Sequence, residues 1–108
     1  RKKTTQVTTS REKLELAIAE IEALYVLGQP QLGLIAYASE TLDIYAVSEQ
    51  LAAKGWFSPL LDEPPAIHLM LSPEHARVID DYISDLKQAV STVESAGLTS
   101  QGVGARYN

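Results

Sequence analysis

Two histidines, His68 and His75, are the side chains of this sequence best suited to proton transfer or metal binding. His68 lies in a stretch where apolar residues alternate, and His75 follows a Ser-Pro pair. A protein zinc site needs three or four converging ligands, and no cluster of His, Asp and Glu has that spacing. The sequence therefore predicts no metal site. His68 has two interpretations: a packing residue of a strand, or a substrate-binding residue in a site formed with another domain.

Other catalytic patterns are missing as well. The chain has no cysteine, no Gly-x-Ser-x-Gly motif and no glycine-rich phosphate loop. A lysine that forms a Schiff base needs a desolvated pocket to lower its pKa. Lys13 and Lys87 fall on polar helix faces, and Lys54 falls at the end of a helix. We therefore expect no catalytic and no cofactor-binding residue within this chain.

The composition indicates one small domain. The chain has 108 residues and a formal net charge of −5, and its acidic balance argues against binding to nucleic acid or anionic membranes. No apolar run approaches the roughly 18 residues of a membrane span, and no signal peptide follows the basic start. We expect a cytoplasmic protein. Because the sequence does not begin with Met, we also expect a piece of a longer polypeptide.

Periodicity predicts helix, strand, strand, helix, strand, strand, helix. The predicted helices begin near Thr9, span about 43–54 and span about 73–95; the predicted strands are 25–27, 32–38, 56–61 and 67–71. Asp43 or Thr41 can cap the second helix, and Ser72 can cap the third. Gly55 and Gly97 are expected to end these two helices.

One-sided helices and short strands predict the fold class α+β. We expect a two-layer sandwich: a small, mainly antiparallel sheet with helices on one face. The other face would remain uncovered unless another domain packs there. The side chains expected on that face are Trp56, Phe57, His68 and Met70.

Several pieces of the sequence resemble the small C-terminal domain of group II pyridoxal-phosphate decarboxylases. They are Leu42-Asp43-Ile44-Tyr45, Leu51-Ala52-Ala53-Lys54-Gly55-Trp56, Pro64-Pro65-Ala66-Ile67-His68-Leu69 and Ser72-Pro73-Glu74-His75. Within that group the chain is most similar to the sphingosine-1-phosphate lyases. The likeness covers nearly the whole chain, from the basic start to Gly104-Ala105-Arg106-Tyr107.

The resemblance implies the small domain of a fold type I pyridoxal-phosphate enzyme. Residues 1–8 would be the end of a linker helix from a large domain, residues 9–97 the α+β small domain, and residues 98–108 the start of a C-terminal extension. The cofactor of the parent enzyme would be pyridoxal 5'-phosphate. Its lysine and its other ligands belong to the large domain, so none is expected in this chain.

The resemblance also implies partners and a reaction. The open sheet face would pack against the large domain of the same protein, and the parent would be a homodimer. The parent would cleave a carbon–carbon bond of a phosphorylated long-chain amino alcohol, giving a long-chain aldehyde and phosphoethanolamine. The isolated chain would be inactive.

Two alternatives stay open at this point. One is the small domain of an amino-acid decarboxylase, and the other is a free-standing, non-catalytic α+β interaction module. Aminotransferases of this fold hold the substrate carboxylate with an arginine of the small domain, whereas strand 67–71 has none and Arg77 falls in a helix. This absence favours a lyase over an aminotransferase. A free-standing module would be stable alone, whereas a small domain with an exposed apolar sheet face would be marginal or self-associating.

Overall fold

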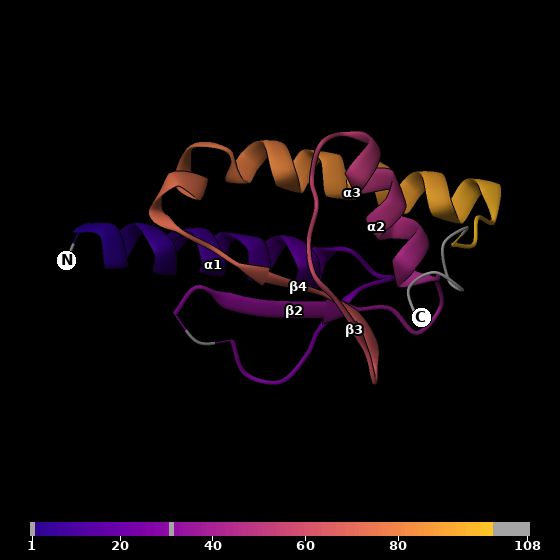
Figure 1. Ribbon diagram of the computed structural model, residues 1–108, viewed down its shortest axis with the longest axis horizontal. Helices are drawn as coiled ribbons and strands as arrows, with labels where there is room; N and C mark the ends of the chain where they lie inside the picture. Colours follow the sequence, from indigo (N-terminus) through magenta and orange to yellow (C-terminus); the bar gives the residue numbers. More distant parts are fainter. Residues whose placement is uncertain (1, 31, 101–108) are drawn as a thin grey trace.

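Eight elements follow one another in the computed structural model, which describes residues 2–30 and 32–100 (Figure 1). They are helix α1 (Lys2–Glu20), strands β1 (Tyr25–Val26) and β2 (Leu34–Ala38), helix α2 (Ile44–Ala53), strands β3 (Leu60–Asp62) and β4 (Pro65–Met70), the 3-10 helix η1 (Pro73–Arg77) and helix α3 (Ile79–Ala96). The predicted element order is confirmed, with η1 as an addition.

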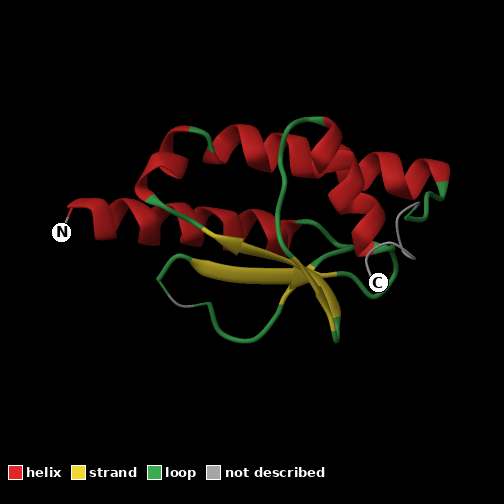
Figure 2. Ribbon diagram, in the orientation of Figure 1, coloured by secondary structure: helices red, strands yellow, loops and turns green. Residues whose placement is uncertain are grey.

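The four strands form one antiparallel sheet in the order β1-β2-β4-β3. Helices α1, α2 and α3 all lie on one face of this sheet, so the molecule has two layers (Figure 2). The fold class predicted from the sequence, an α+β two-layer sandwich, is confirmed. The predictions for residues 101–108 lie outside the described residues.

The core fills the space between the sheet and the three helices. Ile35, Tyr37 and Ile67 point from the sheet into it, and Leu14 and Leu86 meet them from α1 and α3. Side chains alternate along a strand, so the residues between these sheet positions face the other way. The helices therefore bury one sheet face only.

The opposite sheet face exposes several large apolar side chains. Leu34 lies opposite Met70 in the β2–β4 ladder, and Ala36 lies opposite His68. The exposed fractions are 70% for Met70, 40% for Leu34, 38% for Tyr25 and 37% for Leu61. His68 and Met70 thus lie on the open face as predicted.

Trp56 and Phe57 were expected on the same face, and this expectation is wrong. Both residues precede β3, which begins only at Leu60, so the strand predicted over 56–61 is shorter than expected. Trp56 packs against Tyr82 of α3 instead, on the helical side of the sheet. The Trp56 indole donates a hydrogen bond to Asp85 of α3. This contact stabilises Trp56 beside α3 more than the preference of Trp and Phe for strands would stabilise a longer β3.

Helix α1 begins at Lys2, not near Thr9, so residues 2–20 form one continuous helix. Tertiary contacts explain the additional turns. The helix packs against η1, and the side chain of Val7 lies beside Gly33 just before β2. Whether residues 1–8 continue a linker from another domain stays a prediction.

The helix predicted over 73–95 is divided at Val78 into η1 and α3. The other predicted helix ends are confirmed. Asp43 caps α2 by accepting a hydrogen bond from the backbone N–H of Tyr45 (3.0 Å). Gly97 ends α3 in the left-handed conformation, with a φ of 62°.

Gly33 is needed where the start of β2 approaches the end of β4. A Cβ atom there would lie 2.5 Å from the carbonyl oxygen of Leu71 and 2.8 Å from Cγ1 of Val7. We expect Gly33→Ala to lower the free energy of unfolding by about 1–3 kcal/mol, because the backbone of Leu71 must move. Urea unfolding measures this loss, and an unchanged midpoint would show that the approach is looser than described.

Two tyrosines bury their hydroxyl groups in the core. The hydroxyls of Tyr37 and Tyr82 share a hydrogen bond. Burial raises the pKa of Tyr37 well above its ordinary value of 10, and the neighbouring Tyr82 adds to this shift. Burial also raises the pKa of Tyr82, although its hydrogen bond with Tyr37 opposes the shift.

These two shifts predict a loss of stability at alkaline pH. The unfolded chain ionises both tyrosines near pH 10, whereas the folded chain keeps them neutral to higher pH. The contribution of these two tyrosines to the free energy of unfolding is therefore fully present below pH 10 and is lost as the pH rises above it. We expect the urea midpoint to fall less steeply in the Tyr37→Phe/Tyr82→Phe double variant. An equal slope in both proteins would contradict the raised pKa values.

Candidate functional site

Residues 55–59, which we call the strap, connect α2 to β3 and run past α3 (Figure 1). Between the strap, β4, η1 and α3 lies a pocket of about 440 Å³, which we call the strap pocket. Trp56, Leu69, Ile79 and Tyr82 are among the apolar residues that line it. Its volume is in the range of ligand-binding pockets.

Trp56 fixes the strap against α3. Its indole Nε1–H donates a hydrogen bond to Oδ2 of Asp85 (2.8 Å). Its ring meets Tyr82 edge-on, with ring centroids 5.2 Å apart and planes at 89°. This anchor holds the strap on the helical side, so residues 56–58 do not continue the β3 ladder.

The strap pocket opens beside an unpaired edge of β4. The backbone N–H of His68 donates to the carbonyl of Pro59 (3.0 Å), the last contact of this ladder. Leu69 and Leu71 turn their amides toward β2, so Met70 turns its own N–H and C=O toward the strap. Within residues 2–30 and 32–100, neither group of Met70 has a backbone partner.

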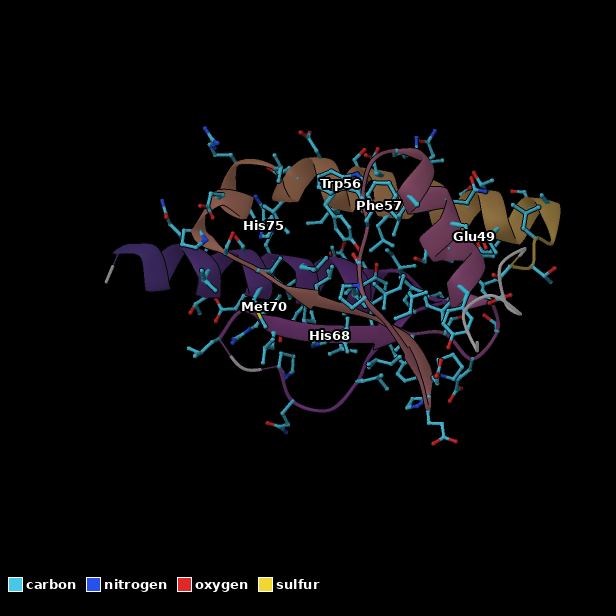
Figure 3. The ribbon with its side chains drawn as sticks, viewed as in Figure 1. Glu49, Trp56, Phe57, His68, Met70 and His75 are labelled. Atoms are coloured by element: carbon cyan, nitrogen blue, oxygen red, sulfur yellow. The ribbon has the colours of Figure 1, made fainter. Side chains whose placement is uncertain are left out.

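His75 lines the strap pocket from η1 with a defined ring orientation (Figure 3). The backbone N–H of Ser72 donates to its Nδ1 (2.8 Å). A backbone amide can only donate, so the neutral ring carries its proton on Nε2. The same contact forms half of a capping box at the start of η1.

The predicted site residues have different outcomes. His68 lies on the open face and also lines the strap pocket, and its role as a substrate-binding residue stays a prediction. His75 is half-buried, and its side chain caps η1. The spacing Ser72-x-x-His75 is that of a capping box, with His in place of the usual Glu or Gln.

Three lysines, Lys13, Lys54 and Lys87, have described side chains, and none of them is buried. Lys13 is exposed and pairs with Asp80 (2.7 Å), while Lys54 and Lys87 are exposed as well. None of the three lines the strap pocket. None of these three lysines therefore has the desolvated surroundings that an imine-forming lysine needs.

The described residues also contain no group of three or more His, Asp and Glu that could hold a metal ion. Among the described helices, none is both long and apolar enough to cross a bilayer.

The anchor between Trp56 and Asp85 predicts a local change rather than global unfolding. We expect Asp85→Ala to lower the free energy of unfolding by about 1 kcal/mol. Trp56 is the single tryptophan of the chain, so its fluorescence reports on the strap alone. The emission is expected to shift to longer wavelength in Asp85→Ala as the indole gains water. Unchanged emission would show that ring packing alone holds the strap.

Comparison with known proteins connects this fold to one enzyme family. No protein-family model matches the chain. A sphingosine-1-phosphate lyase from Arabidopsis thaliana is 35% identical over 92 residues, which cover 85% of this chain and 17% of that protein. Sphingosine-1-phosphate lyase 1 from Rattus norvegicus is 31% identical over 107 residues, which cover 96% of this chain and 19% of that protein.

A solved structure gives the same result. The sphingosine-1-phosphate lyase of Burkholderia pseudomallei superimposes with a TM-score of 0.80 and 26% identity, over 85% of this chain and 21% of that one. The resemblance to these lyases is therefore confirmed in sequence and in fold. The chain spans about one sixth of the length of the Arabidopsis relative, 17%.

Proposed function

We propose that this chain is the C-terminal small domain of a sphingosine-1-phosphate lyase-like enzyme. The observation that carries the proposal is the joint match in sequence and fold, over most of this chain and a small share of each lyase. The longer polypeptide would cleave a phosphorylated long-chain amino alcohol into a long-chain aldehyde and phosphoethanolamine. Its cofactor, pyridoxal 5'-phosphate, would act as the electron sink for cleavage of the carbon–carbon bond.

In this proposal the chain contributes surfaces rather than reacting groups. The open sheet face, with Leu34, Leu61 and Met70 exposed, would pack against the large domain of the same polypeptide. As in the lyases that the chain resembles, the lysine that holds the cofactor would lie in that large domain, and the exposed positions of Lys13, Lys54 and Lys87 agree with this proposal. Two such polypeptides would form a homodimer, which we expect in the cytoplasm.

Turnover assays on the longer polypeptide test the substrate. We expect cleavage of sphingosine-1-phosphate and no decarboxylation of glutamate or of aromatic amino acids. Decarboxylation of an amino acid without cleavage of sphingosine-1-phosphate would show that the longer polypeptide is an amino-acid decarboxylase and not a lyase.

A sizing run and a thermal melt of the isolated 108-residue chain test the open face. We expect self-association or a low melting temperature, and a matched variant with Leu34→Ser and Met70→Ser should associate less. A stable monomer whose size does not respond to these substitutions would favour a free-standing interaction module.

A further inference from the structure

We propose that residues 101–108, which follow the described part of the chain, add a strand to the sheet along the free edge of β3. The inference goes beyond the proposed function, because it assigns a docking surface of this domain to a segment of the same chain. Three observations carry it: the unpaired edge of β3, the place where Ser100 is held, and the sequence pattern of the segment. It holds whether or not the longer polypeptide is a lyase.

Strand β3 is an outer strand of the sheet, and it pairs with β4 on one side only. The backbone N–H of His68 donates to the carbonyl of Pro59, which sets the alternation along this ladder. Leu61 therefore turns its backbone groups toward β4, and Leu60 and Asp62 turn theirs outward. No backbone hydrogen bond within the described part of the chain reaches these outward groups. An open edge of this kind favours pairing with another strand.

Ser100 places the segment beside this edge. Its backbone N–H donates a hydrogen bond to Oδ2 of Asp43, the N-cap of α2 (2.8 Å), and its hydroxyl donates to Oε2 of Glu49 in α2 (2.8 Å; Figure 3 labels Glu49). Glu49 follows Tyr45 by four residues, so both lie on the same face of α2. The Tyr45 hydroxyl donates to the carbonyl of Leu61 in β3 (2.5 Å). Ser100 is therefore held on the side of α2 that contacts β3.

The direction of the added strand follows from the sheet topology. Strands β2 and β3 both pair antiparallel with β4, so they end at the same end of the sheet. Asp43 follows β2 closely in the chain and holds Ser100 at this end. The segment therefore starts beside Asp62 and runs antiparallel to β3. Its eight residues can extend over about 26 Å, whereas the three residues of β3 cover about 10 Å, so the segment reaches along the whole edge.

The segment has the alternation of a strand with one apolar face. Its apolar residues are Val103, Ala105 and Tyr107, and glycines and Arg106 stand between them. Opposite residues of an antiparallel pair share a face of the sheet, and both Leu60 and Asp62 have their side chains on the helical side. The Asp62 carboxylate attracts Arg106 to this side, so Arg106 belongs to the set that hydrogen-bonds with β3. The apolar residues of the segment then extend the open face.

Hydrogen–deuterium exchange of the natural full-length polypeptide that carries this chain tests the proposal. We expect slow exchange of the amides of residues 102–106 and of the outward amides of Leu60 and Asp62. Gly104 lies two residues before Arg106, so its N–H donates to β3 in the added strand, and Gly104→Pro removes this bond. The amides of Leu60 and Asp62 should then exchange about tenfold faster, as expected for the loss of one or two hydrogen bonds.

Ala105→Pro is the matched control. The N–H of Ala105 points away from β3 in the added strand, and proline is tolerated at such positions of an outer strand. The amides of Leu60 and Asp62 should therefore exchange in this variant as they do in the natural polypeptide. Ser100→Ala removes the hydroxyl bond to Glu49 and keeps the backbone N–H, so we expect a smaller acceleration, of severalfold.

Fast exchange of residues 102–106 in the natural polypeptide would overturn the proposal. Equal acceleration in Gly104→Pro and Ala105→Pro would overturn it as well, because a strand alternates the direction of its N–H groups. Slow exchange at Leu60 and Asp62 that neither proline changes would show that another part of the polypeptide covers the edge, which also contradicts the proposal. Failure of the lyase assay alongside the expected exchange pattern would reject the proposed function and leave the added strand standing.

Discussion

Replacing Leu86 with alanine is expected to lower the free energy of unfolding by about 2–5 kcal/mol. Leu86 is completely buried in α3, where the helix meets the sheet and the other helices. Removing three carbons leaves a cavity that the rigid sheet cannot fill. A small domain has only about 5–15 kcal/mol of total stability, so this loss is a large fraction of it. Urea unfolding followed by Trp56 fluorescence measures the loss.

Leu16 provides the matched control for this substitution. It is also a leucine in a helix, but its side chain is 68% exposed on α1. We expect Leu16→Ala to change the free energy of unfolding by no more than about 0.5 kcal/mol. Similar losses in Leu86→Ala and Leu16→Ala would mean that α3 does not pack into the core as described.

Truncation of Tyr82 is the second large effect. Its ring supports Trp56, and its hydroxyl is buried with that of Tyr37. We expect Tyr82→Ala to cost about 3–5 kcal/mol, as for other buried aromatic residues. Tyr82→Phe keeps the ring and leaves the Tyr37 hydroxyl without a partner, so it should cost about 1–3 kcal/mol.

A double-mutant cycle separates the hydrogen bond from the packing. Tyr37→Phe and Tyr82→Phe each leave one buried hydroxyl unsatisfied, whereas the double variant leaves none. The double variant should therefore lose less stability than the sum of the two single variants. Urea unfolding of the four proteins gives the coupling energy. Strict additivity would contradict a direct bond between these hydroxyls.

Local sequence signals predicted much of the fold. The alternation of apolar and other residues around Ile67, and the helical spacing of apolar residues in α3, predicted which residues form the core. Asp43 and Gly97 marked helix ends because capping is a local interaction. Two layers with one open sheet face follow from helices that are apolar on one side only.

Interactions between distant residues limited the prediction. The strap leaves the sheet because Trp56 bonds to Asp85, which is 29 residues away in the chain. Helix α1 extends to Lys2 because η1 packs beside it. Neither hydrophobic periodicity nor residue propensity can predict these two contacts, because both are local properties of the sequence.

The candidate site was only partly predictable for the same reason. His68 was singled out by its place in an apolar strand, and it does line the strap pocket. The pocket itself depends on the displaced strap. The ring orientation of His75 depends on a capping-box contact with Ser72. The sequence predicts this contact only if His can replace the usual Glu or Gln three residues after the N-cap.

Borohydride trapping of the longer polypeptide tests the central claim most directly. The claim is that this chain is a non-catalytic domain whose cofactor-binding lysine lies elsewhere. Reduction with borohydride converts a pyridoxal-phosphate imine into a stable pyridoxyl-lysine, which peptide mapping locates. We predict one such lysine per subunit, outside these 108 residues, and no turnover by this chain alone. A pyridoxyl group on any of the five lysines of these 108 residues, or turnover by the isolated chain, would contradict the claim.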